Sequence, residues 1–129
     1  MLSKIVLLMA VPFVLTACQS PGELRAGAPK LDQTTNTPAE RVAGCVGDKL
    51  EASPVARQGG LLPGAALSSR PTANGYSISV TQTGGFGGTD TIILVDISKV
   101  DNQNTRVQLF THFLFGGDGG MSPLVRACL

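Results

Sequence analysis

The stretch Gly75–Phe115 decides the fold: GYSISVTQTGGFGGTDTIILVDISKVDNQNTRVQLFTHFLF. Apolar and small polar residues alternate from Tyr76 to Thr81, which predicts a half-buried strand. Asp90–Ser98 is rich in β-branched residues and Thr105–Phe115 alternates again, so both predict strands. Two short links separate the three, Gly84–Thr89 and Val100–Asn104. Links this short favour an antiparallel meander.

A helix is predicted on each side of this meander. Upstream, Thr37-Pro38-Ala39-Glu40 indicates a helix start, with Thr37 as the cap and Glu40 reaching back to the cap amide. Apolar residues then recur at helical spacing up to Ser53-Pro54, which ends the helix. Downstream, Ser122-Pro123 predicts a short C-terminal helix. The expected fold is α+β: helix, three-stranded antiparallel meander and short helix, over residues 37–129.

The segment Ser53–Gly75 gives the weakest pattern. It is rich in Gly, Pro and Ser, with apolar islands around Leu61 and Leu67. A structureless stretch of this length is uncommon in a small domain, so we expect a short edge strand or a single helical turn inside it. Asn74-Gly75 predicts a turn directly before the first strand of the meander.

The N-terminus has the features of a leader. Met1–Lys4 carries one positive charge and precedes the ten-residue apolar run Ile5–Val14. Ten residues at about 1.5 Å each span only half of a ~30 Å hydrocarbon core, which fits a signal peptide and not a transmembrane helix. The run ends in Leu15-Thr16-Ala17-Cys18, which resembles the lipobox of bacterial lipoproteins.

This resemblance implies a lipid anchor. Residues 1–17 would be the signal peptide, cleavage would occur before Cys18, and its thiol and new amine would carry diacylglyceryl and acyl chains that bind the membrane. Gln19 follows, where an Asp in this family retains the protein at the inner membrane, so the implied location is the outer membrane, facing the periplasm. The alternative is an ordinary secretory leader with a chance Cys at the cleavage site.

Residues 18–36 are predicted to be a flexible tether. Leu24 and Leu31 are their only large apolar residues, too few to offset the entropy of ordering the segment. As a coil of this length it would reach about 20 to 25 Å and hold the domain just off the bilayer.

The remaining cysteines fit an oxidising compartment. Once Cys18 is lipidated, Cys45 and Cys128 have one possible intramolecular pairing, and we expect a disulfide that closes the domain. A catalytic thiol or a metal pair is the alternative, but a thiol nucleophile needs a base and His112 is the only histidine.

A second, looser resemblance covers the mature chain. It is similar to small uncharacterised proteobacterial envelope lipoproteins through Cys45, Asp48-Lys49, Gly75-Tyr76 and Cys128. Those proteins often place Trp after the Asp-Lys pair, where this chain has Leu50. The resemblance implies no particular activity.

Composition excludes several classes of function. The chain has 10 basic and 9 acidic residues, and removal of the leader takes away Lys4, so the mature side chains balance. A neutral chain has no long-range attraction for nucleic acid. The sequence also has no phosphate-binding loop, no dinucleotide fingerprint and no metal-ligand cluster, so no cofactor is expected.

Two surfaces are candidates for binding. The similar segments Phe86–Asp90 and Phe115–Asp118 would share one rim of the sheet, where two carboxylates could take a cation or a cationic peptide, unless they are merely flexible turns. The sheet face that two short helices leave uncovered is the second candidate, unless Leu61–Leu67 folds over it. The candidate binding residues are Phe86, Asp90, Phe110, Leu114 and Asp118.

The expected function is therefore that of a non-catalytic, lipid-anchored envelope protein that binds a protein or another envelope component. A periplasmic inhibitor of a hydrolase such as lysozyme is the alternative, and a cell-wall enzyme is the third. His112 lies in an apolar strand with no orienting acid nearby in sequence, which favours a surface or partly buried strand histidine over a catalytic base.

Overall fold

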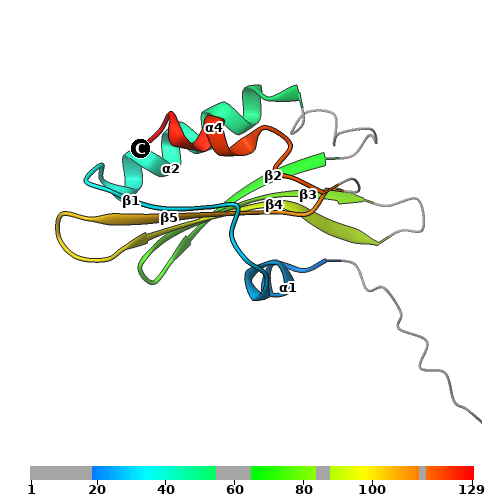
Figure 1. Ribbon diagram of the computed structural model, residues 1–129, viewed down its shortest axis with the longest axis horizontal. Coiled ribbons are helices and arrows are strands. Elements are labelled where there is room, and N and C mark those ends of the chain that lie inside the picture. The colour runs from blue at the N-terminus through cyan, green and yellow to red at the C-terminus, as the bar shows by residue number, and fades with distance from the viewer. Residues whose placement is uncertain (1–18, 55–64, 84–87, 114–115) are drawn as a thin grey trace, which may run out of the picture.

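The computed structural model describes residues 19–54, 65–83, 88–113 and 116–129. In these residues one antiparallel sheet has the strand order β1-β5-β4-β3-β2. Its strands are β1 (Leu31–Thr35), β2 (Ala65–Thr72), β3 (Gly75–Thr83), β4 (Thr89–Lys99) and β5 (Thr105–Thr111). Helices α2 (Ala39–Ala52) and α4 (Met121–Arg126) lie on one face of the sheet, and α1 (Pro21–Ala26) lies on the other (Figure 1).

The expectation of a three-stranded meander is wrong, because the sheet has five strands. The expected meander is present as β3, β4 and β5, although β5 ends at Thr111 and not at Phe115. β2 adds to it through a tight turn that pairs Thr72 with Gly75, and forms one edge. β1 pairs with β5 and forms the other edge. The edge strand expected within 53–75 is therefore β2, while residues 55–64 lie outside the described part.

The segment predicted to be a flexible tether is ordered from Gln19 onward, as α1 and β1. Ser20 caps α1 by accepting from the Glu23 amide, and the Glu23 carboxylate accepts from the Ser20 amide, which is a complete capping box. Leu24 is 7% exposed and Leu31 is 5% exposed, so both apolar residues of the segment are buried. The prediction failed because it weighed the burial of two leucines against the entropy of ordering an isolated segment. In the structure both leucines pack against the rest of the sheet.

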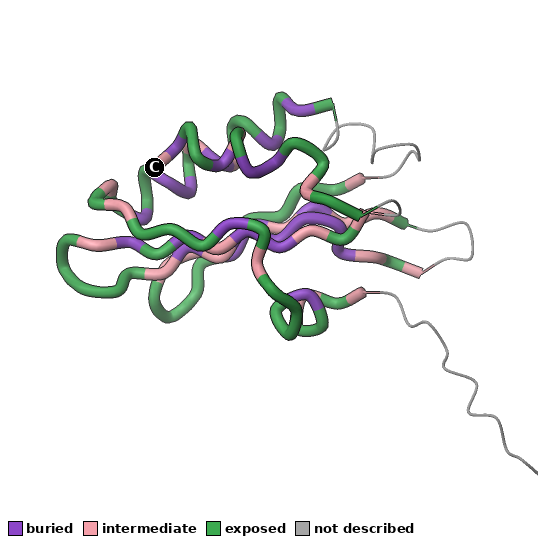
Figure 2. Tube along the Cα trace, in the orientation of Figure 1, coloured by how far each residue is buried: buried purple, intermediate pink, exposed green. Residues whose placement is uncertain are grey.

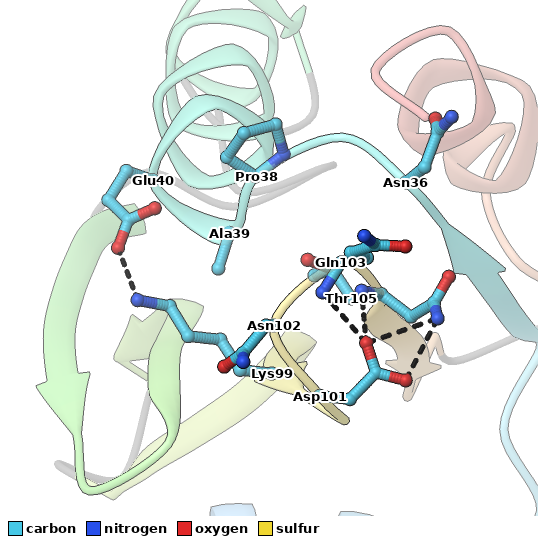
Figure 3. A pocket seen from close by; sticks show the side chains of 10 residues that line it. Asn36, Pro38, Ala39, Glu40, Lys99, Asp101, Asn102, Gln103 and Thr105 are labelled. Atoms are coloured by element: carbon cyan, nitrogen blue, oxygen red, sulfur yellow. Dashed lines mark hydrogen bonds and ion pairs between the residues drawn. The ribbon is translucent and has the colours of Figure 1, made fainter.

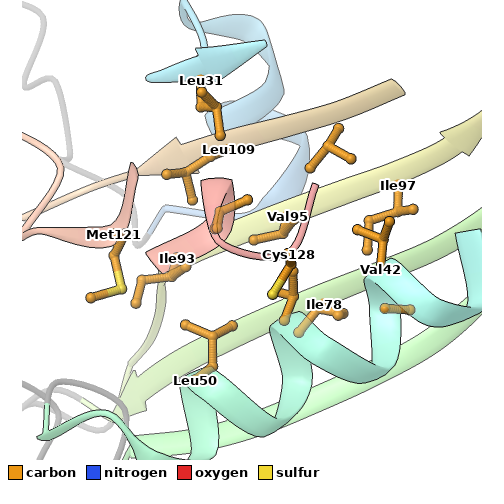
Figure 4. Packing of buried hydrophobic residues seen from close by; sticks show 14 of the residues in the cluster. Leu31, Val42, Leu50, Ile78, Ile93, Val95, Ile97, Leu109, Met121 and Cys128 are labelled. Atoms are coloured by element: carbon orange, nitrogen blue, oxygen red, sulfur yellow. The ribbon is translucent and has the colours of Figure 1, made fainter. Parts of the chain in front are cut away.

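The core lies between the sheet and the two helices on its first face. The apolar stripe predicted for α2 is confirmed, since Val42, Val46 and Leu50 are fully buried. Val42 and Leu50 point towards the sheet, which contributes Ile78 and Ile97 to the same cluster (Figure 4). Each such side chain contributes about 1.5 to 3 kcal/mol on full burial. Figure 2 shows the buried residues concentrated between these layers and β2 exposed.

Both helices on this face begin differently from the expectation. The N-cap of α2 is Pro38, with no side-chain cap, and its carbonyl accepts from the amides of Arg41 and Val42 at 3.0 Å. Thr37 instead receives a hydrogen bond from the Thr35 hydroxyl at 3.2 Å. The helix ends at Ser53, as predicted. α4 starts at Met121, one residue before the predicted cap, so the cap is glycine.

A disulfide joins Cys45 of α2 to Cys128, two residues beyond the end of α4. The two α-carbons are 5.7 Å apart, and the residues are separated by 83 positions in the sequence. The predicted pairing is confirmed, and it fixes α2 to the C-terminal helix above the sheet. Among the described residues no helix has the length and apolarity needed to cross a membrane.

Candidate binding surfaces

The described parts of the two Gly-rich segments, 88–90 and 116–118, lie at one end of the sheet, but their carboxylates are engaged in structural hydrogen bonds. We call this end, where β3 ends and β4 begins, the Gln19 end, because Gln19 is bonded there. Asp90 accepts a hydrogen bond from the Gln19 amide at 2.7 Å, and the Gln19 carbonyl accepts from the Thr91 amide at 2.8 Å. Phe86 and Phe115 lie outside the described residues.

Asp118 has a comparable role at the start of α4. Its carboxylate accepts from the amides of Gly120 at 2.9 Å and Ser122 at 3.1 Å, so it takes over the capping role predicted for Ser122. Hydrogen bonds from Ser122 and from the backbone of Gly120 lower the pKa of Asp118. The carboxylates of Asp118 and Asp90 both bind backbone amides, so structural roles account for the two acids of the expected rim site.

The second face of the sheet, expected to be exposed, is partly covered by α1. Phe110 is only 5% exposed, because it packs with Leu94 of β4 and Leu24 of α1. The cover that the structure describes is therefore α1. Of the segment Leu61–Leu67, residues 61–64 lie outside the described part, and Leu67 is 38% exposed in β2. Leu114 lies outside the described residues. The signal for this cover was readable in Ser20-Pro21-Gly22-Glu23, a capping box with proline at the first helical position.

A polar cluster holds α1 on this face. Arg25 forms a two-pronged pair with Asp96, with Nε to Oδ2 at 2.6 Å and Nη2 to Oδ1 at 2.9 Å. Arg25 Nη2 also donates to the Ser77 hydroxyl at 3.1 Å, and that hydroxyl donates to Asp96 at 3.0 Å. The bond to Asp96 raises the pKa of Arg25. We call Leu24, Arg25 and their sheet partners the α1 latch.

The rest of this face is polar. Arg106 pairs with Asp32 across β5 and β1, with Nη2 to Oδ2 at 2.6 Å and Nε to Oδ1 at 2.9 Å. The bonds from Arg106 lower the pKa of Asp32. Among the described residues only Leu67 and Val100 are large, apolar and exposed. The described surface therefore has no broad apolar patch, and the described residues of the predicted docking face do not form one.

A pocket of about 730 Å³ lies at the opposite end of the sheet, which we call the hairpin end after the turn Val100–Asn104. The start of α2 and this turn form its walls (Figure 3). Glu40 accepts from Lys99 Nζ at 2.6 Å, a bond that lowers the pKa of Glu40 and raises that of Lys99. Sequence reasoning missed this pocket because its residues come from separate elements and no local motif joins them.

The turn residues of the pocket bind one another. The Asp101 carboxylate accepts from the Asn104 side chain at 2.9 Å and from the amides of Gln103 and Asn104 at 2.8 Å. These bonds, the one from the Asn104 side chain foremost, lower the pKa of Asp101. The acids of the pocket stay ionised and Lys99 stays protonated near neutral pH, so these groups suit polar recognition and not proton transfer.

The described residues contain neither a metal-binding cluster nor a buried, unpaired polar side-chain atom. No group of three or more His, Cys, Asp and Glu residues within them could hold a metal ion. His112 is exposed after the end of β5, and its backbone amide donates to the Ile92 carbonyl at 2.8 Å. Every buried side-chain nitrogen or oxygen in this part of the chain has a hydrogen-bond partner. Comparison with protein-family models, with curated proteins and with solved structures found no match.

Proposed function

We propose that the protein is a non-catalytic, lipid-anchored module of the bacterial envelope that binds a protein or another envelope component at its hairpin end. Lipid on Cys18 would hold it at the outer membrane, on the periplasmic side. The observation that carries the proposal is the sequence Leu15-Thr16-Ala17-Cys18, which resembles a lipoprotein processing motif and directly precedes Gln19, the residue bonded to the start of β4.

The disulfide supports the location. Structural disulfides persist in the periplasm and other oxidising compartments and are rare in the cytosol. Cys45 and Cys128 join the first long helix to the C-terminal segment, so the domain is closed by a bond that the proposed compartment preserves. In the proposed mature protein Cys18 carries the lipid, so all three cysteines have a role.

The chemistry of the described residues supports a binding role over catalysis. The charged pairs Glu40–Lys99 and Arg106–Asp32 have pKa values displaced away from neutrality, whereas a general acid or base works best with a pKa near the operating pH. The amide-rich pocket at the hairpin end is a hollow in the described surface that suits a polar partner, whereas α1 covers the apolar part of the sheet face.

Processing at Cys18 tests the anchor. Treatment with globomycin, which blocks the lipoprotein signal peptidase, should make the precursor accumulate, and Cys18→Ser should prevent incorporation of labelled palmitate. Ala17→Gly keeps a small residue before the cysteine and serves as the matched control that is still processed. Full-length protein in the cytosol with three free thiols would contradict the proposal.

Photo-crosslinking in cells tests the binding role. A crosslinking residue at Asn102, exposed in the hairpin turn, should give a discrete adduct, while one at Arg70, exposed on β2, should not. Adducts at Arg70 alone would contradict the assignment of the hairpin end. Clearing of peptidoglycan in a zymogram would replace the proposal with a cell-wall enzyme, and inhibition of lysozyme by the purified protein would identify the partner as a hydrolase.

A further inference from the structure

The first described residue is fixed to the sheet by two hydrogen bonds. The Gln19 amide donates to Asp90 and its carbonyl accepts from Thr91, at 2.7 and 2.8 Å, so both polar groups of its backbone are bound at the start of β4. Neither bond uses a free α-amine. Cleavage before Cys18 and acylation of its new amine would leave both bonds intact.

The residues that follow Gln19 are also bound to the domain and do not form a flexible linker. Ser20 and Glu23 close the capping box of α1, Leu24 is 7% exposed against Leu94 and Phe110, and Arg25 makes a two-pronged pair with Asp96. These contacts hold residues 19–26 against the sheet. A lipid on Cys18 would therefore be separated from the folded domain by one peptide unit, about 3.8 Å between α-carbons.

We propose, on the basis of the lipidation proposed above, that the domain stands directly on the lipid surface through its Gln19 end and presents its hairpin end away from the membrane. The partner of the Gln19 end is the bilayer itself. β4 runs 11 residues between the two ends, roughly 35 Å at about 3.3 Å per residue, so the pocket would lie well beyond the headgroups.

The broad faces of the domain are poor alternatives for contact with lipid. A surface that lies flat on a membrane combines apolar side chains with an excess of Lys and Arg. The face that carries α1 has the balanced pairs Arg25–Asp96 and Arg106–Asp32. Helix α2 exposes Glu40, Asp48 and Glu51 against Arg41 and Lys49, so it has no excess of basic residues. The described residues of the Gln19 end include the uncharged Thr83 and Thr89, and its carboxylates Asp90 and Asp118 accept hydrogen bonds from backbone amides.

The test measures which end lies near lipid. Cys18 would carry the anchor and Cys45 is bonded to Cys128, so an engineered cysteine is the only free thiol available for labelling. A fluorophore is placed at Thr83→Cys or at Asn102→Cys, both exposed, in lipidated protein inserted into phosphatidylethanolamine–phosphatidylglycerol vesicles. Spin-labelled lipid should quench the label at 83 several-fold more than the label at 102.

The α1 latch provides the matched comparison. The double variant Leu24→Asp/Arg25→Ala should free residues 19–30, which then reach about 20 Å as a coil, and quenching at position 83 should fall towards that at position 102. Arg106→Ala, which removes an ion pair of similar geometry on the same face, should leave the wild-type pattern. Equal quenching at both positions in the wild type, or a wild-type pattern in the double variant, would overturn the proposal.

Failure here can be told apart from failure of the proposed function. Flotation with vesicles and the mass of the N-terminal peptide report the lipid directly. Protein without lipid that stays out of the vesicles contradicts the anchor and the orientation together. Lipidated protein that floats with equal quenching at the two positions contradicts only the orientation.

Discussion

Arg25 and Asp96, 71 residues apart in the sequence, form a two-pronged ion pair that fastens the N-terminal helix to the centre of the sheet. Asp96 lies on β4, the strand at the middle of the five, and its side chain is 18% exposed. The pair converts a segment with the composition of a linker into part of the domain. It therefore determines how the chain leaves any anchor placed before Gln19.

Removal of the ion pair should destabilise the domain by a modest amount. Arg25→Ala should lower the free energy of unfolding by about 1 kcal/mol, because the pair is partly exposed and Ser77 and Asp96 also lose a partner. Arg106→Ala is the control. The side chains of Arg106 and Asp32 are 49% and 36% exposed, so loss of their pair should lower the free energy of unfolding by less. Urea unfolding of the Cys18→Ser chain measures both. A larger loss in Arg106→Ala would contradict the role assigned to Arg25.

Leu24 should contribute more than Arg25. Leu24→Ala leaves a hole between Leu94 and Phe110, and such truncations of buried leucine cost about 2 to 5 kcal/mol. The lower part of that range is expected, because the site lies at the surface side of the sheet. Leu67→Ala, at a residue 38% exposed in β2, is the control and should stay within about 0.5 kcal/mol of the wild type. Equal losses in denaturant unfolding would mean that α1 does not pack as described.

The sequence predicted the elements that have an apolar pattern of their own and missed those that do not. The strands β3 and β4 and the stripe of α2 were predictable, because each carries its own apolar periodicity. β1 has one buried residue, Leu31, and three exposed positions, so its identity comes from pairing with β5 and not from its own pattern. β2 is exposed at seven of its eight positions, so it too is identified by its pairing, with β3, and not by its own pattern.

The interactions of the candidate binding residues could not be predicted from the sequence. Asp90 and Asp118 were predicted to bind a cation or a cationic peptide, but their carboxylates accept hydrogen bonds from backbone amides, which no side-chain motif indicates. The pocket at the hairpin end joins Glu40 to Lys99 across 59 residues. The turn at Asp101-Asn102 was predicted, but its position beside α2 follows from the packing of that helix on the sheet.

The disulfide should be the largest single contribution to stability that can be removed. The double variant Cys45→Ser/Cys128→Ser opens a loop of 83 residues, and the chain-entropy relation gives about 4 to 5 kcal/mol as an upper value. Using both substitutions avoids a lone reactive thiol. Unfolding in urea with and without a reductant should show the wild type approaching the double variant only when reduced. No difference would show that the bond is dispensable for stability.

Two glycines should respond to alanine in opposite directions. Gly119 has φ of +60°, and a β-carbon there would lie 2.7 Å from the Phe113 ring, so Gly119→Ala should cost about 1 to 3 kcal/mol. Gly44 lies in α2 with nothing within 4 Å of an added β-carbon, so Gly44→Ala should gain about 0.5 to 1 kcal/mol. Thermal unfolding compares them. Similar shifts for both would contradict the turn that leads into α4.

Stability should fall in acid through Asp118. Its pKa in the folded protein lies below the ordinary value of 3.8, because Ser122 and Gly120 donate to the carboxylate. The stabilisation is therefore present above 3.8 and is lost as the pH falls through the lower folded-state pKa. Asp118→Ala should cost about 1 kcal/mol at neutral pH, where the cap is lost. Asp118→Asn, which keeps one acceptor without the charge, should cost less.

In acid the wild type should approach both variants, because a protonated Asp118 no longer binds the two amides as an anion. Urea unfolding at neutral pH and at a pH well below 3.8 measures the gap for each variant. Both variants should show a flatter dependence on pH across this window than the wild type. If the wild type and the variants differed in free energy of unfolding by the same amount at both pH values, the charge of Asp118 would not contribute to the stability of α4.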